Sequence, residues 1–161
     1  MSVTVTIPEG FEYVGASLFL TAVLLQGLSS TVGRYRKLAK IEYPQMYAEK
    51  KEMEESREAL LFNCAQHDAD IGHGQQALII MRLNMTIISG LRFPIPSAIA
   101  CAFWCLSRVS YAHGYLTGNP KKRGTILYYA GEVALGGLFL SSGYVAAGWV
   151  FPGLLGLARR S

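Results

Sequence analysis

Long stretches without a charged side chain constrain this sequence more than any other feature. Residues 13–32 and 133–157 contain no Asp, Glu, Lys or Arg, and residues 93–120 contain Arg108 as their sole charge. A helix rises about 1.5 Å per residue, so about 20 residues cross the hydrocarbon core of a bilayer. The buried helices of soluble proteins are usually shorter and amphipathic. The pattern therefore predicts an all-α protein embedded in the lipid bilayer.

A fourth apolar stretch is interrupted. Residues 59–91 begin and end apolar, but the segment 67–76 contains two glycines and several ionisable groups, which are unfavourable in a membrane helix. We therefore expect a bundle of four transmembrane helices, with a broken segment in the second. The predicted spans are about 13–32, 59–91, 94–116 and 125–150.

The spans define a single membrane domain over residues 13–157. A short lead over residues 1–12 precedes it, and a tail over residues 158–161 follows it. The lead contains no Lys or Arg, and no small-residue cleavage site follows a short apolar core. We therefore expect the first span to be an anchor and not a cleaved signal.

The placement of the basic residues predicts the orientation in the membrane. The net charge is +4, and most bases fall between the first and second spans or between the third and fourth. These residues are Arg34, Arg36, Lys37, Lys40, Lys50, Lys51, Arg57, Lys121, Lys122 and Arg123. The opposite ends carry Arg92, Arg159 and Arg160. The positive-inside rule then places both basic loops in the cytosol. Glutamates interleave with these bases, which makes a nucleic-acid partner a poor explanation.

Neither the cysteines nor the histidines predict a metal site. Three cysteines do not form a disulfide framework, and we expect Cys101 and Cys105 to pack inside the third span. One cluster of possible ligands comprises His67, Asp68, Asp70 and His73. Its spacing fits no standard zinc pattern, and the neighbouring glycines oppose a rigid helical frame. We expect no metal.

The third span carries the best candidate for a binding site. Arg108, Tyr111 and Tyr115 are spaced i, i+3 and i+7, which places them on one helical face, with Trp104 a turn earlier. A guanidinium and two phenols on one face can hold a small anion. Arginine and tyrosine are also common as anchors at the depth of the lipid headgroups. The residues alone support both interpretations equally.

The same segment carries a resemblance. Residues Arg108–Gly124 contain the pattern Arg-x-x-Tyr-x-x-Gly-Tyr followed by a short basic turn, which resembles the microsomal glutathione S-transferase 3 family of the MAPEG superfamily. Further blocks, Lys40–Tyr47, Phe62–Gln66 and Gly90–Pro94, resemble the same family in the same order. The likeness extends over about residues 13–149.

The resemblance implies a homotrimer of four-helix subunits in the endoplasmic reticulum membrane and the nuclear envelope. It implies that glutathione is the co-substrate, conjugated to lipophilic electrophiles or used to reduce lipid hydroperoxides, with no metal. The residues that would contact glutathione are Arg36, Arg108, Tyr111 and Tyr115. Arg123 would correspond to the arginine that activates the thiolate, and the length of the turn makes Lys122 a substitute for it.

The second span departs from the family pattern. His67, Ile71 and Gly74 stand where the family carries the Arg, Asn and Glu that hold glutathione. A genuine divergence and a translated intron both explain the change, and its abruptness between two matching blocks favours the intron. Two further hypotheses therefore stand beside the enzyme. One is a catalytically impaired membrane scaffold, and the other, less favoured, is an anion transporter that uses Arg82, Arg108 and Glu132.

Overall fold

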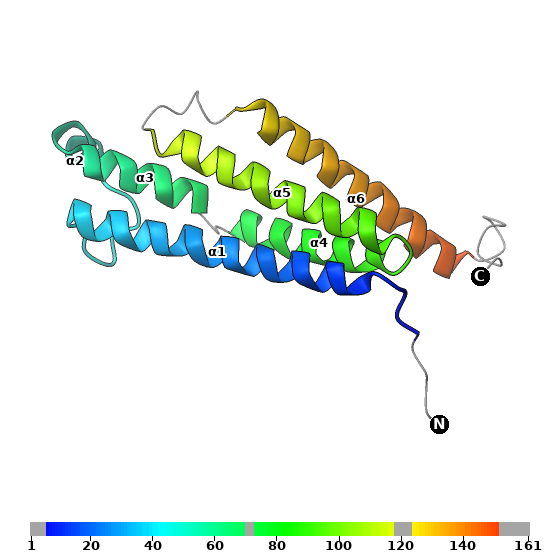
Figure 1. Cartoon of the computed structure of the whole chain (residues 1–161). Coiled ribbons are helices and arrows are strands. Elements are labelled where there is room, and N and C mark those ends of the chain that lie inside the picture. Colours follow the sequence, from blue (N-terminus) through cyan, green and yellow to red (C-terminus); the bar gives the residue numbers. More distant parts are fainter. Residues whose placement is uncertain (1–5, 70–72, 118–123, 152–161) are drawn as a thin grey trace.

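The chain folds into a bundle of α-helices. The computed structural model describes residues 6–69, 73–117 and 124–151, and these residues contain helices but no strand. The helices are α1 (Phe11–Ala39), α2 (Lys50–Glu55), α3 (Arg57–Ala69), α4 (His73–Gly90), α5 (Pro94–Tyr115) and α6 (Ile126–Val150) (Figure 1). The predicted all-α class is confirmed.

Local chemistry sets the ends of the long helices. Gly10 precedes α1 with a φ of 85°, in the region that glycine tolerates best, and Lys40 ends the helix with a φ of 56°. α1 therefore continues beyond the apolar run 13–32 into the basic cluster. Pro94 occupies the first turn of α5, where its missing N–H costs nothing. The Thr125 side chain caps α6 by accepting a hydrogen bond from the Tyr128 backbone N–H at 3.1 Å.

A short helix lies in the basic segment between the first two predicted spans. Glu49 and Glu52 form a capping box, in which each side chain accepts a hydrogen bond from the other residue's backbone N–H. This pair begins α2. The Lys50 Nζ and Glu54 Oε1 atoms lie 4.0 Å apart on the exposed surface. The segment is therefore more ordered than its proline and its charge indicate.

The second predicted span corresponds to two helices. α3 continues through His67 to Ala69, and α4 already begins at His73, so regular helix covers most of the predicted break at 67–76. In Figure 1, α3 and α4 follow each other along the bundle beside α1. The cost of Gly74 in a helix is about 1 kcal/mol, which packing against the neighbouring helices can offset.

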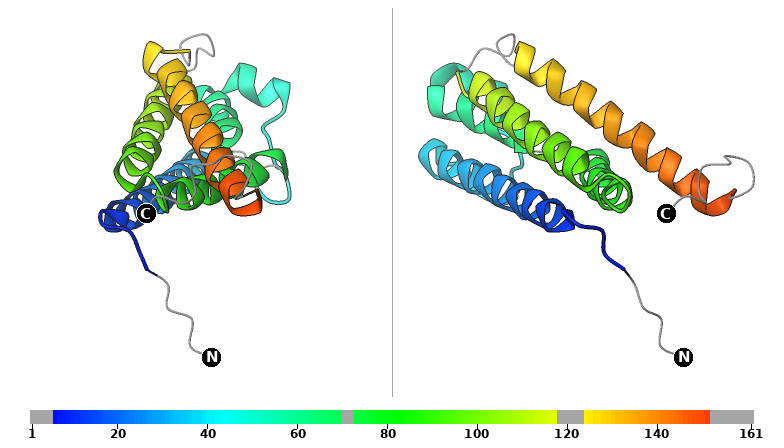
Figure 2. Two further views of the ribbon diagram at one scale, coloured as in Figure 1. Left: turned by 90° about the vertical axis from the view of Figure 1, so that its right-hand side faces the viewer. Right: turned by 45° about the vertical axis from the view of Figure 1, so that its right-hand side comes forward.

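α5 lies between α1 and α6 and packs on both. α3 packs on α1 near one end of the bundle, and α4 packs on α6 toward the other (Figure 2). The approach of α5 to α6 is close at one point, because a Cβ atom added to Gly131 would overlap the Ser107 side chain. Small residues at a crossing let membrane helices approach closely.

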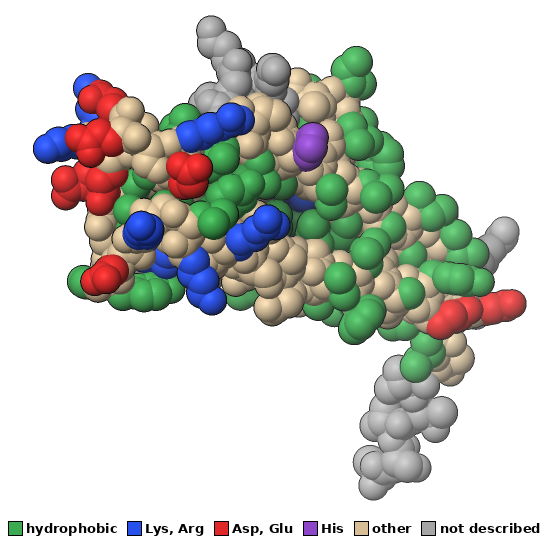
Figure 3. All heavy atoms as spheres, turned by 60° about the vertical axis from the view of Figure 1, so that its left-hand side comes forward, with side chains coloured by type: hydrophobic (Ala, Val, Ile, Leu, Met, Phe, Trp, Pro, Cys, Tyr) green, Lys and Arg blue, Asp and Glu red, His purple; other side chains and the backbone are tan. Residues whose placement is uncertain are grey.

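The outer surface divides into an apolar flank and a charged end. Large apolar side chains, such as Phe19, Val133 and Leu140, are exposed on the helices. Among the described residues, α1 and α6 are long and apolar enough to cross a membrane. Charged side chains gather over α2 and the adjoining helix ends (Figure 3). This distribution suits a helical membrane bundle whose flank faces lipid.

A network of serine hydroxyls joins three helices away from the charged end. Ser89 Oγ of α4 lies 2.7 Å from both Ser97 Oγ of α5 and Ser141 Oγ of α6. Ser97 also lies 2.6 Å from the Phe93 carbonyl, and Ser141 lies 3.1 Å from the Leu138 carbonyl. Hydroxyls paired in this way can be buried at low cost in a membrane bundle.

Candidate functional site

Stacked side chains at the charged end of α5 form the core of the candidate site. The Arg108 guanidinium carbon lies 4.6 Å from the centre of the Tyr111 ring. The Tyr111 and Tyr115 rings stack with centres 5.7 Å apart, and Tyr115 is only 7% exposed. From α6, the Tyr128 ring centre lies 4.9 Å from that of Tyr111. The structure therefore brings together three of the predicted glutathione contacts, packed against the bundle.

The structure adds a residue that the sequence reasoning did not assign. The His67 ring of α3 stacks on Tyr115, with centres 5.6 Å apart and planes 28° apart. His67 occupies the position where the resembling family carries an arginine. A neutral imidazole has one nitrogen donor and one nitrogen acceptor. The signal that would have found His67 is its position directly after the matched block 62–66.

Arg36 lies in a different cluster. Its Nη1 donates hydrogen bonds to the Gln45 carbonyl at 2.8 Å and the Ile41 carbonyl at 3.4 Å. Its guanidinium carbon lies 4.2 Å from the Tyr43 ring centre and 4.7 Å from the Phe62 ring centre. Within the described residues, these contacts tie the end of α1 to the segment that follows it. The predicted contact of Arg36 with glutathione stays a prediction.

Asn63 strengthens the same connection. Its Oδ1 accepts a hydrogen bond from the Ala48 backbone N–H at 2.7 Å, and its Nδ2 donates one to the Ala48 carbonyl at 2.9 Å. The amide thus binds both polar groups of one backbone residue. We call Arg36 and Asn63, with the backbone of residues 41–48 that they bind, the loop clamp. Asn63, in the block 62–66, therefore has a structural role in this chain, because it holds the segment 41–48 against α3.

An apolar groove lies on another face of α5 at the same end. It has a volume of about 330 Å³ and is lined by α1, α3 and α5, with Leu24, Leu28 and Val109 on its walls and His113 at its polar side. Ligand pockets of this size, lined by apolar side chains, are typical for small lipophilic molecules. The groove and the stacked rings share the helix that carries Arg108.

The structure describes neither candidate for the activating group. Arg123 and Lys122 lie outside the described residues, as do the side chains of Asp68 and Asp70. Within the described residues, no group of three or more His, Cys, Asp or Glu side chains is placed to hold a metal ion.

A half-buried arginine and a buried tryptophan lie in contact deeper in the bundle. Arg82 of α4 lies over the ring of Trp104 of α5, and each has a buried nitrogen without a hydrogen-bond partner among the described residues. From the sequence, Arg82 is named only in the less favoured hypothesis of an anion transporter, and its contact with Trp104 is not predicted.

A comparison with known protein families gives one match. The model of the MAPEG family matches residues 14–144, which is well over half of the chain. The matched range begins in α1 and ends in α6, and it includes the stacked rings, the loop clamp and the contact between Arg82 and Trp104.

Proposed function

The chain belongs to the MAPEG family, and from this premise we propose that it is a membrane-bound glutathione S-transferase and glutathione-dependent lipid hydroperoxide peroxidase. Family membership supports a membrane activity related to glutathione or to eicosanoids. The observation that carries the finer proposal is the stack in which Arg108 covers Tyr111 and Tyr111 covers Tyr115. This stack gives one cation and two phenol donors at the charged end of a lipid-facing bundle.

The chemistry that such a site must supply is activation of a thiol. The thiolate is the nucleophile, and a thiol is mostly protonated at neutral pH. A hundredfold increase in the thiolate fraction requires roughly 2.7 kcal/mol of preferential stabilisation of the anion. A guanidinium in a water-poor site, helped by a phenol hydrogen bond, can supply that amount. We assign glutathione binding to Arg108, Tyr111 and Tyr115, and activation of the sulfur to Arg123.

The two reactions use the same anion. In conjugation, the sulfur forms a bond to the electrophilic carbon and the leaving group departs with the electron pair. In the peroxidase reaction, the sulfur takes the distal oxygen of the hydroperoxide, and the alkoxide that leaves is protonated to the alcohol. A second glutathione then displaces water from the sulfenic acid and forms the disulfide. Glutathione is the co-substrate throughout, and we propose no metal.

The setting follows from the same proposal. We assign the chain to the endoplasmic reticulum membrane and the nuclear envelope, as a homotrimer with the basic loops in the cytosol. The bilayer concentrates lipophilic electrophiles and lipid hydroperoxides beside the bundle. The apolar groove on α5 is suited to receive them, because its walls are largely aliphatic.

The test is activity and binding in purified protein. Glutathione binding is measured by calorimetry in detergent, and turnover is measured with a chlorinated nitrobenzene and with a fatty-acid hydroperoxide. Arg108→Met should weaken glutathione binding at least tenfold, because a charge-assisted hydrogen bond is lost. Arg92→Met is the matched control, since Arg92 is exposed in the turn after α4. Equal glutathione affinity in the two variants would contradict the assigned role of Arg108.

A second variant separates binding from activation. Arg123→Ala should lower turnover much more than glutathione affinity, because a group that stabilises the thiolate acts on the reacting anion. Unchanged turnover in this variant, with Lys122→Ala inactive, would transfer the activating role to Lys122. Unchanged turnover in both variants would refute activation by the basic turn.

One observation favours a catalytically impaired scaffold as the second candidate function. His67 stands where the family arginine is expected, and it lies directly against Tyr115. A site that lacks that arginine has fewer donors for the carboxylates of glutathione. The scaffold is the correct reading if calorimetry detects no glutathione binding while the protein is folded in detergent.

A further inference from the structure

Arg82 has a buried N–H group that no acceptor among the described residues receives. Its guanidinium carbon lies 4.3 Å from the centre of the Trp104 ring, and its Nε is buried without a hydrogen-bond partner among the described residues. Trp104 is only 4% exposed, and its Nε1 is in the same condition. A ring face attracts a guanidinium but accepts none of its N–H groups in the way an oxygen does. Two donors therefore lie side by side with no described oxygen to receive them.

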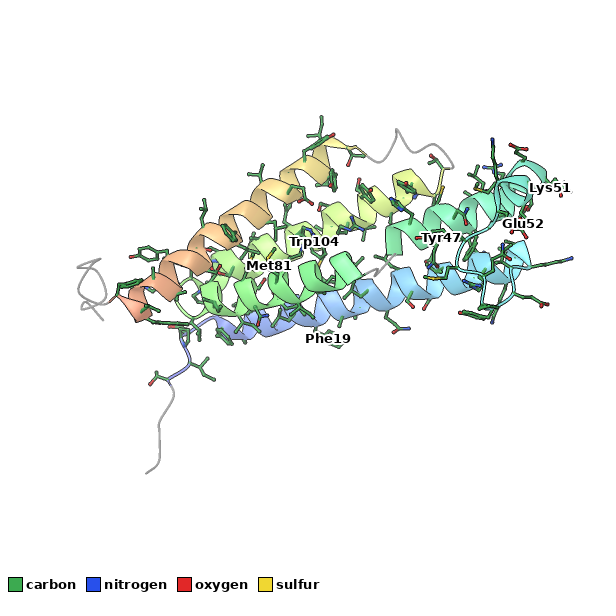
Figure 4. The ribbon with its side chains drawn as sticks, turned by 180° about the vertical axis from the view of Figure 1, so that it is seen from behind. Phe19, Tyr47, Lys51, Glu52, Met81 and Trp104 are labelled. Carbon is green, nitrogen blue, oxygen red and sulfur yellow. The ribbon has the colours of Figure 1, made fainter. Side chains whose placement is uncertain are left out.

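The position of this pair makes the deficit costly. Arg82 lies about 12 Å along α4 from Gly90, and Trp104 lies near the middle of α5 (Figure 4). Neither residue lies at an end of its helix, so in helices that cross a hydrocarbon core of about 30 Å both would lie away from the headgroups. Ionisable residues at this depth are expensive and are a default indication of a ligand or ion site.

The neighbouring charged groups do not supply the missing hydrogen-bond acceptor. Glu132 and Tyr128 of α6 and Arg108 of α5 lie within electrostatic range of Arg82. Within the described residues, no carboxylate oxygen forms an ion pair with Arg82 within 4.0 Å. Glu132 lowers the electrostatic cost of the guanidinium, but it does not receive its hydrogen bonds.

An apolar groove lies farther along the same helices, beyond Arg82 and Trp104. It has a volume of about 310 Å³ and lies between α4, α5 and α6, lined mostly by Phe93, Ala100, Ala134 and Leu138. It also includes Ser89, seven residues after Arg82 on α4, and Ala100 lies four residues before Trp104 on α5. These spacings keep the groove on the helix faces that carry the orphan donors. Its serine hydroxyls already contact one another.

We propose that Arg82 and Trp104 bind the carboxylate of a long-chain fatty acid whose acyl chain lies in this groove. A carboxylate offers two oxygens, which match the fork of a guanidinium and leave a lone pair for an indole N–H. The chain enters sideways from the bilayer, where fatty acids are concentrated. The proposal concerns binding alone and does not depend on glutathione chemistry.

The experiment uses Trp104 as the reporter. The chain contains two tryptophans, so a Trp149→Phe background leaves Trp104 as the single source of indole fluorescence. Stearic acid with a nitroxide at carbon 5 should quench it in a saturable manner, and more strongly than stearic acid with the nitroxide at carbon 16. The methyl ester of the first probe should bind at least tenfold more weakly, because it lacks the anion. Equal quenching by acid and ester would overturn the proposal in the otherwise unchanged protein.

One variant tests the guanidinium donor against a matched control, and a further variant tests the negative charge near the site. Arg82→Met should weaken binding of the acid at least tenfold, whereas the exposed control Arg92→Met should leave it unchanged. Glu132→Gln should strengthen binding several-fold, because it removes a negative charge that faces the ligand. Saturable binding that survives Arg82→Met, or that weakens with Glu132→Gln, would show that the carboxylate binds elsewhere. Because the acid and ester are compared without a change at Arg82, a folding defect in one variant does not protect the proposal.

Discussion

Two arginines occupy opposite kinds of environment in the same bundle. At the charged end, Arg36 donates to two backbone carbonyls and lies between the rings of Tyr43 and Phe62. Inside the bundle, Arg82 lies over a single ring and donates to no described acceptor. The same side chain is thus a structural tie in the first region and an unsatisfied donor in the second.

The comparison separates two uses of charge in a membrane protein. Near water, a guanidinium can combine ring contacts and hydrogen bonds at little desolvation cost, so it stabilises the fold. Deep in the bundle, the desolvation cost is high and is recovered only when an anion arrives. Arg108 lies between these cases, at the charged end of α5 and over Tyr111. A residue's chemistry therefore follows from its depth as much as from its type.

The comparison between Arg36 and Arg82 depends first on how closely α5 approaches α6, because this approach sets the surroundings of Arg82. Gly131→Val should cost about 3 kcal/mol or prevent folding, because the added atoms overlap Ser107 and force the helices apart. The same shift would remove Tyr128 from Tyr111 and Glu132 from Arg82. Thermal unfolding in detergent measures the loss. Gly136→Ala is the matched control, since nothing lies within 4 Å of its added Cβ, and an equal loss there would contradict the close crossing.

Arg36→Met tests the structural half of the comparison. It should lower the free energy of unfolding by about 2 kcal/mol, because charged hydrogen bonds to two carbonyls disappear. Limited proteolysis should then cut the 41–48 segment faster. Arg34→Met is the control, because Arg34 is exposed on the preceding turn. If the two variants have the same unfolding temperature and the same cutting rate, Arg36 does not hold this segment.

Arg82→Met tests the arginine inside the bundle. We expect it to raise the free energy of unfolding, whereas Arg36→Met lowers it. Methionine has a similar length and no charge, so the variant should be more stable than the parent by about 1 kcal/mol in lipid-free detergent. Addition of a long-chain fatty acid should stabilise the parent and not the variant. A lower unfolding temperature for Arg82→Met without added fatty acid would mean that Arg82 is already satisfied within the protein.

His67→Arg has the smallest expected effect, and it places a second arginine, after Arg108, beside the stacked rings. It should tighten glutathione binding roughly threefold, equivalent to about 0.7 kcal/mol, because it supplies donors where the related proteins have them. Calorimetry with His67→Ala and His67→Lys separates the effects of ring loss, charge and geometry. A weaker affinity in His67→Arg than in the parent would show that the imidazole stack on Tyr115 is itself important for the site.

The parts of the structure that the sequence predicted depend on local signals. The uncharged run from 133 onward predicts the long α6, and Pro94 predicts the start of α5. The i, i+3, i+7 spacing of Arg108, Tyr111 and Tyr115 predicts a shared face, because helical geometry alone decides it. These features require no knowledge of how the helices pack.

The parts that were not predicted depend on contacts between distant segments. The loop clamp requires the chain to turn back after α1, so the Arg36 contacts cannot be derived from spacing. The stack of His67 on Tyr115 depends on how α3 meets α5. The contact of Arg82 with Trp104 likewise depends on where α4 packs against α5, and no local pattern encodes that position.

The serine network joining α4, α5 and α6 has one hydrogen fewer than it has short oxygen–oxygen contacts. Ser89, Ser97 and Ser141 have one hydroxyl hydrogen each. The contacts that need a hydrogen are four: Ser89–Ser97, Ser89–Ser141, and the contacts of Ser97 and Ser141 with backbone carbonyls. One short oxygen–oxygen contact is therefore always without its hydrogen, and rotation of the hydroxyls moves that vacancy between helices. The hydroxyl hydrogens can therefore be arranged in more than one way on the same backbone, and in some of these arrangements the Ser89–Ser141 contact between α4 and α6 is the one without a hydrogen.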